Sequence, residues 1–216
     1  MEKENLCVDI DKTFMDYINN KIIRIVNSNE FKERLEKINR YYFNLKQEFH
    51  IRNLFLELLN DSFYNDSKSD LKAISEYPRI NNKRVDLSIY DKKNKTRFSI
   101  EFKFQFSRDY NQFTKYKDLV NNDFIKRDTS LFILIIEHWN RPKKEKSEKE
   151  EYDDNWGIEH GLTKYIAYEN EKEWENNINK ILREYINAKL ITKSIFITKL
   201  FDVEYYFYFL QKKECK

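Results

Sequence analysis

The segment RFSIEFKFQF, residues 97–106, constrains the fold more than any other part of the chain. Phenylalanine or isoleucine occupies every second position from Phe98 to Phe106, and polar residues stand between them. Side chains of a β-strand point alternately to its two faces, so this alternation predicts a strand with one buried face. The polar face carries Ser99, Glu101, Lys103 and Gln105. Such a face is either an ordinary solvated surface or a functional site.

The composition excludes several classes of protein. The chain has 216 residues and a net charge of +3, which suits one domain and does not by itself indicate a nucleic-acid-binding protein. With only two glycines and two prolines, the sequence contains no glycine-rich phosphate-binding loop. Cys7 and Cys215 match no metal-binding spacing and favour a reducing compartment. No apolar run reaches membrane-spanning length, so we expect a soluble cytoplasmic protein with no membrane partner.

The order of the predicted elements indicates an α/β fold with a central mixed sheet flanked by helices. Apolar residues at helical spacing predict helices at residues 12–26, 31–45, 48–60, 110–126 and 171–187. Strands are predicted at residues 84–90, 97–106 and 131–139, with two more within 194–211. The polar stretch at 61–70 predicts a loop. The run LFILIIEHW within the third strand is almost wholly apolar, which is typical of a strand buried on both faces.

The first two predicted strands bring two carboxylates together. If they form a hairpin that turns at residues 93–94, Asp86 lies opposite Glu101. Opposed side chains of an antiparallel pair project to the same face, where two carboxylates repel each other. A divalent cation removes this conflict, and Mg²⁺ typically takes one or two carboxylates with water and phosphate oxygens. Lys103 lies on the same face, about 7 Å along the strand, where it can stabilise charge on a phosphate.

Asp86 followed by Glu101-Phe102-Lys103 resembles the signature of the PD-(D/E)xK nuclease superfamily, the fold of many restriction endonucleases. That signature has an acidic residue on an N-terminal helix, an Asp at the first core strand and (D/E)xK on the next strand. Val85 stands where the family has a proline before the Asp. The resemblance implies a restriction-endonuclease-like core with an N-terminal helical extension.

The resemblance also implies a set of catalytic residues. Asp86, Glu101 and a helical glutamate would hold Mg²⁺, with Mn²⁺ as a possible substitute, and Lys103 would assist catalysis. Glu48, at the start of EFHIRNLFLELL, resembles the helical glutamate. The alternatives for this role are Glu57 and Glu76. Glu48 also lies four residues before an arginine, so an ordinary helix ion pair explains it equally well.

Three further residues are candidates for accessory roles, as is Glu76. Gln105 shares the polar face of the strand and can contact the scissile phosphate, although solvation explains it equally well. Gln112 and Tyr116, in QFTKY, resemble the Q-h-x-x-Y motif of the exonuclease-like branch of the superfamily. They lie one helical turn apart on one face, and core packing explains Tyr116 equally well.

Together, these features predict a Mg²⁺-dependent nuclease that hydrolyses phosphodiester bonds of DNA in restriction, phage defence or DNA repair, with a homodimer as one option. We expect a single domain, residues 1–216. It divides into a helical extension at 1–44, a nuclease core at 45–139, and a C-terminal helix and strands at 140–216 that complete the sheet. Two alternatives stay open. One is a non-catalytic nucleic-acid-binding or scaffolding module on the same fold, and the other is an interaction protein whose ExK triplet is coincidental.

Overall fold

The computed structural model describes residues 12–42, 45–66, 70–77, 79–80, 83–107, 122, 129–140, 176, 180, 194–197 and 202–211. The elements in these ranges are α1 (Lys12–Val26), α2 (Asn29–Tyr42), α3 (Glu48–Asn65), β1 (Leu71–Ser75), β2 (Arg79–Ile80), β3 (Lys83–Arg84), β4 (Leu87–Asp91), β5 (Thr96–Phe106), β6 (Leu131–Asn140), β7 (Ser194–Ile197) and β8 (Asp202–Gln211). None of these three helices is long and apolar enough to cross a membrane. The helices predicted at 110–126 and 171–187 lie outside the described residues, apart from single positions.

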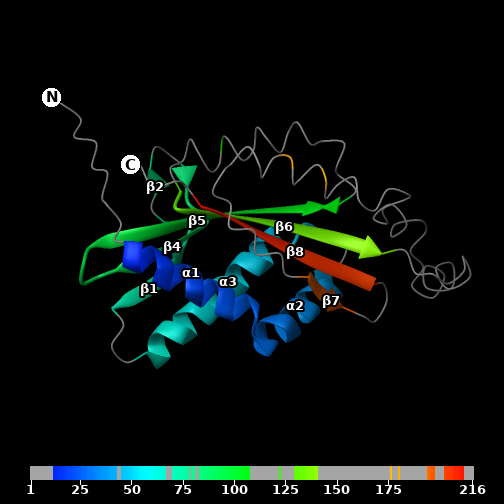
Figure 1. Cartoon of the computed structure of the whole chain (residues 1–216), viewed down its shortest axis with the longest axis horizontal. Helices are drawn as coiled ribbons and strands as arrows, with labels where there is room; N and C mark the ends of the chain where they lie inside the picture. Colours follow the sequence, from blue (N-terminus) through cyan, green and yellow to red (C-terminus); the bar gives the residue numbers. More distant parts are fainter. Residues whose placement is uncertain are drawn as a thin grey trace, which may run out of the picture.

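A six-stranded mixed sheet forms the centre of the molecule (Figure 1). Its strand order is β1-β4-β5-β6-β8-β7, and β2 and β3 form a separate two-stranded sheet. β5 and β6 run parallel, whereas the other neighbouring pairs of the large sheet are antiparallel. The predicted restriction-endonuclease-like α/β fold, with a central mixed sheet and an N-terminal helical region, is therefore confirmed.

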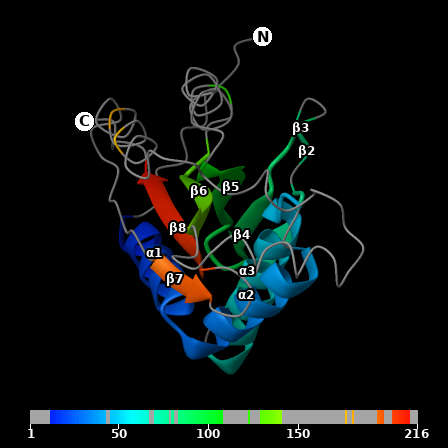
Figure 2. The same cartoon turned by 90° about the vertical axis from the view of Figure 1, so that its right-hand side faces the viewer.

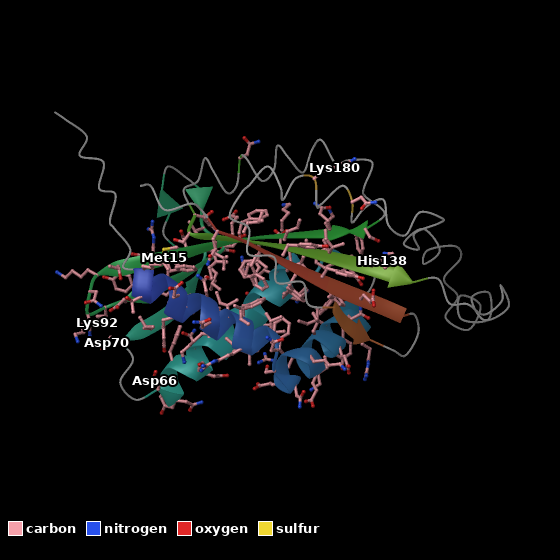
Figure 3. The ribbon with its side chains drawn as sticks, viewed as in Figure 1. Met15, Asp66, Asp70, Lys92, His138 and Lys180 are labelled. Atoms are coloured by element: carbon pink, nitrogen blue, oxygen red, sulfur yellow. The ribbon has the colours of Figure 1, made fainter. Side chains whose placement is uncertain are left out.

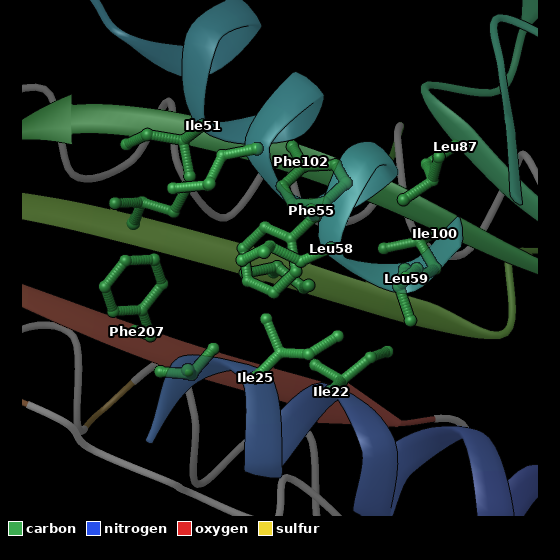
Figure 4. Close-up of a cluster of buried hydrophobic side chains, with 14 of the residues drawn as sticks. Ile22, Ile25, Ile51, Phe55, Leu58, Leu59, Leu87, Ile100, Phe102 and Phe207 are labelled. Atoms are coloured by element: carbon green, nitrogen blue, oxygen red, sulfur yellow. The ribbon is translucent and has the colours of Figure 1, made fainter. Parts of the chain in front are cut away.

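The three helices lie together on one face of the large sheet (Figure 2). Phe55 of α3 is fully buried, and its ring centroid lies 5.1 Å from that of Phe31 in α2 and 5.4 Å from that of Phe102 in β5. Ile22 and Ile25 of α1 complete this core from the side of β8 (Figure 4). Each helix faces the sheet with the apolar stripe that its periodicity predicted.

Both faces of β5 are buried, although the sequence indicated only one. The phenylalanine and isoleucine side chains face the helices and are at most 4% exposed. On the opposite face Ser99, Glu101 and Gln105 are 4%, 4% and 5% exposed. β5 is an interior strand of the sheet, with β4 on one side and β6 on the other. Simple solvation therefore does not account for these polar residues.

The hairpin of β4 and β5 confirms the predicted register over five residue pairs, which end at Leu87 opposite Ile100. Asp91 closes the hairpin turn by accepting backbone hydrogen bonds from two of its residues. Asp86 lies one residue before β4, so the predicted ladder pair of Asp86 with Glu101 is wrong in detail. The ladder stops because the chain bends at Asp86.

The remaining differences concern the ends of elements and short strands. α3 continues to Asn65 through part of the predicted loop, because Phe63 extends its buried stripe. α2 ends at Tyr42, before the exposed Leu45. β1, β2 and β3 were not predicted, whereas the predicted burial of β6 is confirmed for residues 131–138.

His138 near the end of β6 and the hairpin turn at Lys92 lie at opposite ends of the sheet (Figure 3).

Candidate active site

β5 extends past the end of β4, and two carboxylates accept hydrogen bonds where a neighbouring strand would otherwise lie. Pairing with β4 stops at Ile100. The backbone N–H of Phe102 donates to Oδ2 of Asp86 over 2.8 Å, and that of Phe104 donates to Oε2 of Glu48 over 2.9 Å. Buried backbone donors require acceptors, and ionised acceptors make the stronger hydrogen bonds. The backbone of β5 therefore fixes both carboxylates along one edge.

Glu48 reaches this edge because it is the first residue of α3. Its Oε2 atom also lies 3.7 Å from Nζ of Lys103, and a negative charge is stabilised near a helix N-terminus. The alternative ion pair within the helix is not formed, since Nη1 of Arg52 lies 3.4 Å from Oε1 of Glu76 instead. Glu48 is thus directed towards the sheet rather than along its own helix.

Glu101 and Lys103 project from the face of β5 that is opposite to the helices. Glu101 is buried, whereas the side chain of Lys103 is 26% exposed. Their neighbours on β6 are Phe132 and Leu134, both buried. A charged group in apolar surroundings is costly, so a chain retains one there only with compensating partners. The structure therefore brings Asp86, Glu48 and Lys103 to residues 102–104 of β5, directly after the residue that carries the Glu101 side chain.

Two other predicted acidic residues have different surroundings. Glu76 has a positive φ of 52°, and its backbone N–H donates to the carbonyl oxygen of Asp86 over 3.0 Å. A side-chain hydrogen bond from Arg84, supported by the charge of that arginine, holds the pKa of the Glu76 carboxyl below its ordinary value of 4.5. Glu57 is exposed and pairs with Arg34 of α2. Of the three glutamates considered for the helical role, Glu48 is the one that contacts β5.

The accessory candidates are only partly described. Gln105 is buried, and its Oε1 accepts a hydrogen bond from Nζ of Lys46 over 3.2 Å. Lys46 was not a candidate from the sequence, although it stands two residues before Glu48. Gln112 and Tyr116 lie outside the described residues.

The family model of the PD-(D/E)XK nuclease superfamily matches residues 64–198, more than half of the chain. The chain belongs to this superfamily. The matched segment includes Asp86, Glu101 and Lys103, whereas Glu48 precedes it. No curated protein and no solved structure matches the chain.

PD-(D/E)XK nucleases generally use divalent metal ions, and the donor set of this member fits one. Within the described ranges, no group of three or more His, Cys, Asp and Glu side chains is placed to hold a metal ion. Mg²⁺ needs fewer, because one or two carboxylates with water and phosphate oxygens suffice. Asp86 is bound to the amide that directly follows Glu101, and Glu48 is bound two residues further along. All three offer the oxygen donors that a hard cation prefers.

A buried polar cluster beside the candidate site was not anticipated from the sequence. Its members are Asn39, Gln47, Glu137 and Tyr205. Burial, reinforced by the charge of Glu137, raises the pKa of the Tyr205 phenol well above its ordinary value of 10.0. The available signal was Glu137, the one acidic residue in the apolar run LFILIIEHW. Nothing in the periodicity of β8 distinguishes Tyr205 from its other aromatic residues.

Proposed function

We propose that this PD-(D/E)XK protein is a metal-dependent nuclease that hydrolyses phosphodiester bonds of DNA. The observation that carries the proposal is the convergence of Asp86, Glu101, Lys103 and Glu48 on residues 101–104 of β5. Glu101 and Lys103 belong to this piece of strand, and Asp86 and Glu48 are bound to its amides. One or two of these carboxylates, with an ammonium group beside them, suit a divalent cation and a phosphate. The hydrogen bonds along the edge of β5, the position of Glu48 at the start of α3 and the family membership all support this assignment.

In this proposal Asp86 and Glu101 hold the metal ion, with Glu48 as an additional ligand. Bound Mg²⁺, or Mn²⁺ in its place, would polarise the phosphate and lower the pKa of an attacking water. The contribution of the chain is preorganisation: the amides of Phe102 and Phe104 fix two of the carboxylates before any substrate binds.

Lys103 supplies positive charge to the same site. Its ammonium group lies beside the Glu48 carboxylate and its side chain is partly exposed, so it can reach a phosphate that approaches from solvent. There it stabilises the negative charge that develops on the phosphate during hydrolysis.

The accessory candidates have proposed roles of their own. Gln105 contacts phosphate further along the same face of β5, and Glu76 supports the backbone of Asp86 through its N–H group. Gln112 and Tyr116 are retained from the motif alone. The proposal treats residues 1–216 as one nuclease domain that acts in restriction, phage defence or DNA repair, as a homodimer if both strands are cut.

A cleavage assay on several substrates tests this function. Purified protein is incubated with supercoiled plasmid, linear duplex, single-stranded DNA and RNA, each with Mg²⁺, with Mn²⁺ or with EDTA. We expect nicked or linear plasmid only when a divalent metal is present. Cleavage of the plasmid would identify an endonuclease, because circular DNA offers no end to an exonuclease. Degradation restricted to linear DNA would indicate an exonuclease, and degradation restricted to RNA would reject the DNA assignment. Salt-sensitive binding without cleavage of any substrate would favour the non-catalytic module.

A further inference from the structure

Gln47, the residue at the N-cap of α3, directs its side chain into the protein. Side chains at this position usually accept a hydrogen bond from the first free N–H groups of the helix, but Gln47 makes no such bond. Instead its Oε1 atom accepts a hydrogen bond from the hydroxyl of Tyr205 over 2.8 Å, and its Nε2 atom donates to the carbonyl oxygen of Tyr42 over 3.2 Å. Gln47 is 0% exposed. The first turn of α3 is thus held from inside the protein.

Tyr205 belongs to the buried cluster that joins α2, the start of α3, β6 and β8. The amide nitrogen of Asn39 donates to the Tyr205 hydroxyl over 2.6 Å and to Oε1 of Glu137 over 2.9 Å. The Tyr205 hydroxyl lies 2.8 Å from Oε1 of Gln47 and 3.3 Å from Oε1 of Glu137. It has one proton to donate, and the shorter distance favours Gln47 as the acceptor. Hydrogen bonds thus connect Asn39, Tyr205, Gln47 and Oε1 of Glu137, and connected buried hydrogen bonds favour a rigid unit.

Apolar side chains of similar size would fill this space without the cost of burying a carboxylate. What they would not provide is a directional contact to Gln47. Gln47 is covalently joined to Glu48, whose carboxylate is bound by the amide of Phe104. One peptide unit of the chain is therefore held at the buried cluster on one side and at β5 on the other.

We propose that the cluster of Asn39, Gln47, Glu137 and Tyr205 positions Glu48 at the edge of β5. Tyr205 and Gln47 are then positioning residues, which act through Glu48 and do not touch the substrate. The placement of Glu48 stands on the hydrogen bonds alone, whereas its consequence for cleavage rests on the proposed function.

Hydrogen exchange of two backbone amides measures the placement without metal or DNA. Tyr205→Phe removes the donor to Gln47 and keeps the ring. We expect exchange of the Phe104 amide, whose acceptor is Glu48, to become roughly tenfold faster relative to the Phe102 amide, whose acceptor is Asp86. The ratio of the two rates cancels any general loss of stability.

Two further variants keep this measurement decisive. Tyr206→Phe is the matched control, because it removes a hydroxyl from the next residue of β8 that is bonded to Glu204, and it should leave the ratio unchanged. Gln47→Met removes the acceptor of the Tyr205 hydroxyl without changing β8. It should raise the ratio of the Phe104 to the Phe102 exchange rate as Tyr205→Phe does. It also replaces Tyr205→Phe as the test if that variant does not fold. An unchanged ratio in Gln47→Met would overturn the proposal.

A double-mutant cycle tests the consequence for catalysis. Tyr205→Phe should lower metal-dependent cleavage by about tenfold in the wild-type background and have no further effect once Glu48→Gln is present. Equal effects in both backgrounds would mean that Tyr205 does not act through Glu48. If the wild-type protein cleaves nothing, the proposed function fails, and the exchange ratio still decides whether the cluster positions Glu48.

Discussion

At the scale of single residues, Asp86 has a structural contact as well as a proposed metal ligand role. Asp86→Asn keeps an oxygen that can accept from the Phe102 amide but loses the negative charge. We expect the free energy of unfolding without metal to change little. The increase in melting temperature that Mg²⁺ or Mn²⁺ gives the wild type should disappear, because a ligand stabilises only the state that binds it. Thermal unfolding with and without metal measures this, and a full metal increment in Asp86→Asn would remove Asp86 from the site.

Lys103 separates metal binding from catalysis. Lys103→Met keeps most of the side-chain stem and removes the ammonium group from the vicinity of Glu48. Because all the proposed metal carboxylates remain, the metal-induced rise in melting temperature should persist, while the cleavage rate should fall by about a hundredfold. Lys93→Met, in the exposed hairpin turn, is the control and should cleave at the wild-type rate. A Lys103→Met protein that cleaves normally would exclude the proposed role.

The ion pairs of Glu76 predict a pH-dependent contribution to stability. Its pKa in the folded protein is lowered from 4.5, chiefly by the hydrogen bond from Arg84, so its ionised form stabilises the folded state. That contribution is fully present above the unfolded value and is lost as the pH falls below 4.5 through the lowered pKa. Urea unfolding should show Glu76→Gln to be less stable than the wild type at pH 7. The difference should shrink on acidification, and one that grows instead would contradict the assignment.

At the scale of elements, α3 both anchors the core and carries Glu48. Phe55 is fully buried between α2 and β5, whereas Phe49 is 55% exposed beside Arg52. Phe55→Ala should lower the free energy of unfolding by about 3–5 kcal/mol, and the matched Phe49→Ala by less than about 1 kcal/mol. Urea titrations of both variants measure this. Similar losses for the two would mean that α3 does not pack on the sheet as described.

The longest predicted elements are those with a sustained hydrophobic pattern. β5 and the three helices repeat an apolar period over ten or more residues, and β6 is a nearly continuous apolar run, which explains why the sequence identified them. β2 and β3 have two residues each, too few for any period to emerge. The motif likewise indicated Asp86, Glu101 and Lys103, but not that β4 begins only after Asp86. Where a strand ends, and where α3 contacts the sheet, depends on tertiary packing that no local pattern encodes.

At the scale of the whole molecule, the N-terminal helices complete a site whose signature lies further along the chain. The family match begins at residue 64, near the end of α3, and the D…ExK residues lie within it. Glu48, at the other end of α3, contacts the (D/E)xK strand all the same. The helical region therefore contributes to the proposed active site as well as covering one face of the sheet.

The rate of metal-dependent DNA cleavage by Asp86→Asn, compared with the wild type and with Asp91→Asn, tests the central claim most directly. Asp91 is a buried aspartate at the opposite end of β4, where it accepts hydrogen bonds in the hairpin turn, so Asp91→Asn controls for the same chemical change elsewhere. The wild type and Asp91→Asn should cleave with Mg²⁺ or Mn²⁺ and not with EDTA, and Asp86→Asn should be slower by about a hundredfold or more. Equal rates for Asp86→Asn and the wild type, or wild-type cleavage that persists in EDTA, would contradict a metal-dependent nuclease site at the edge of β5.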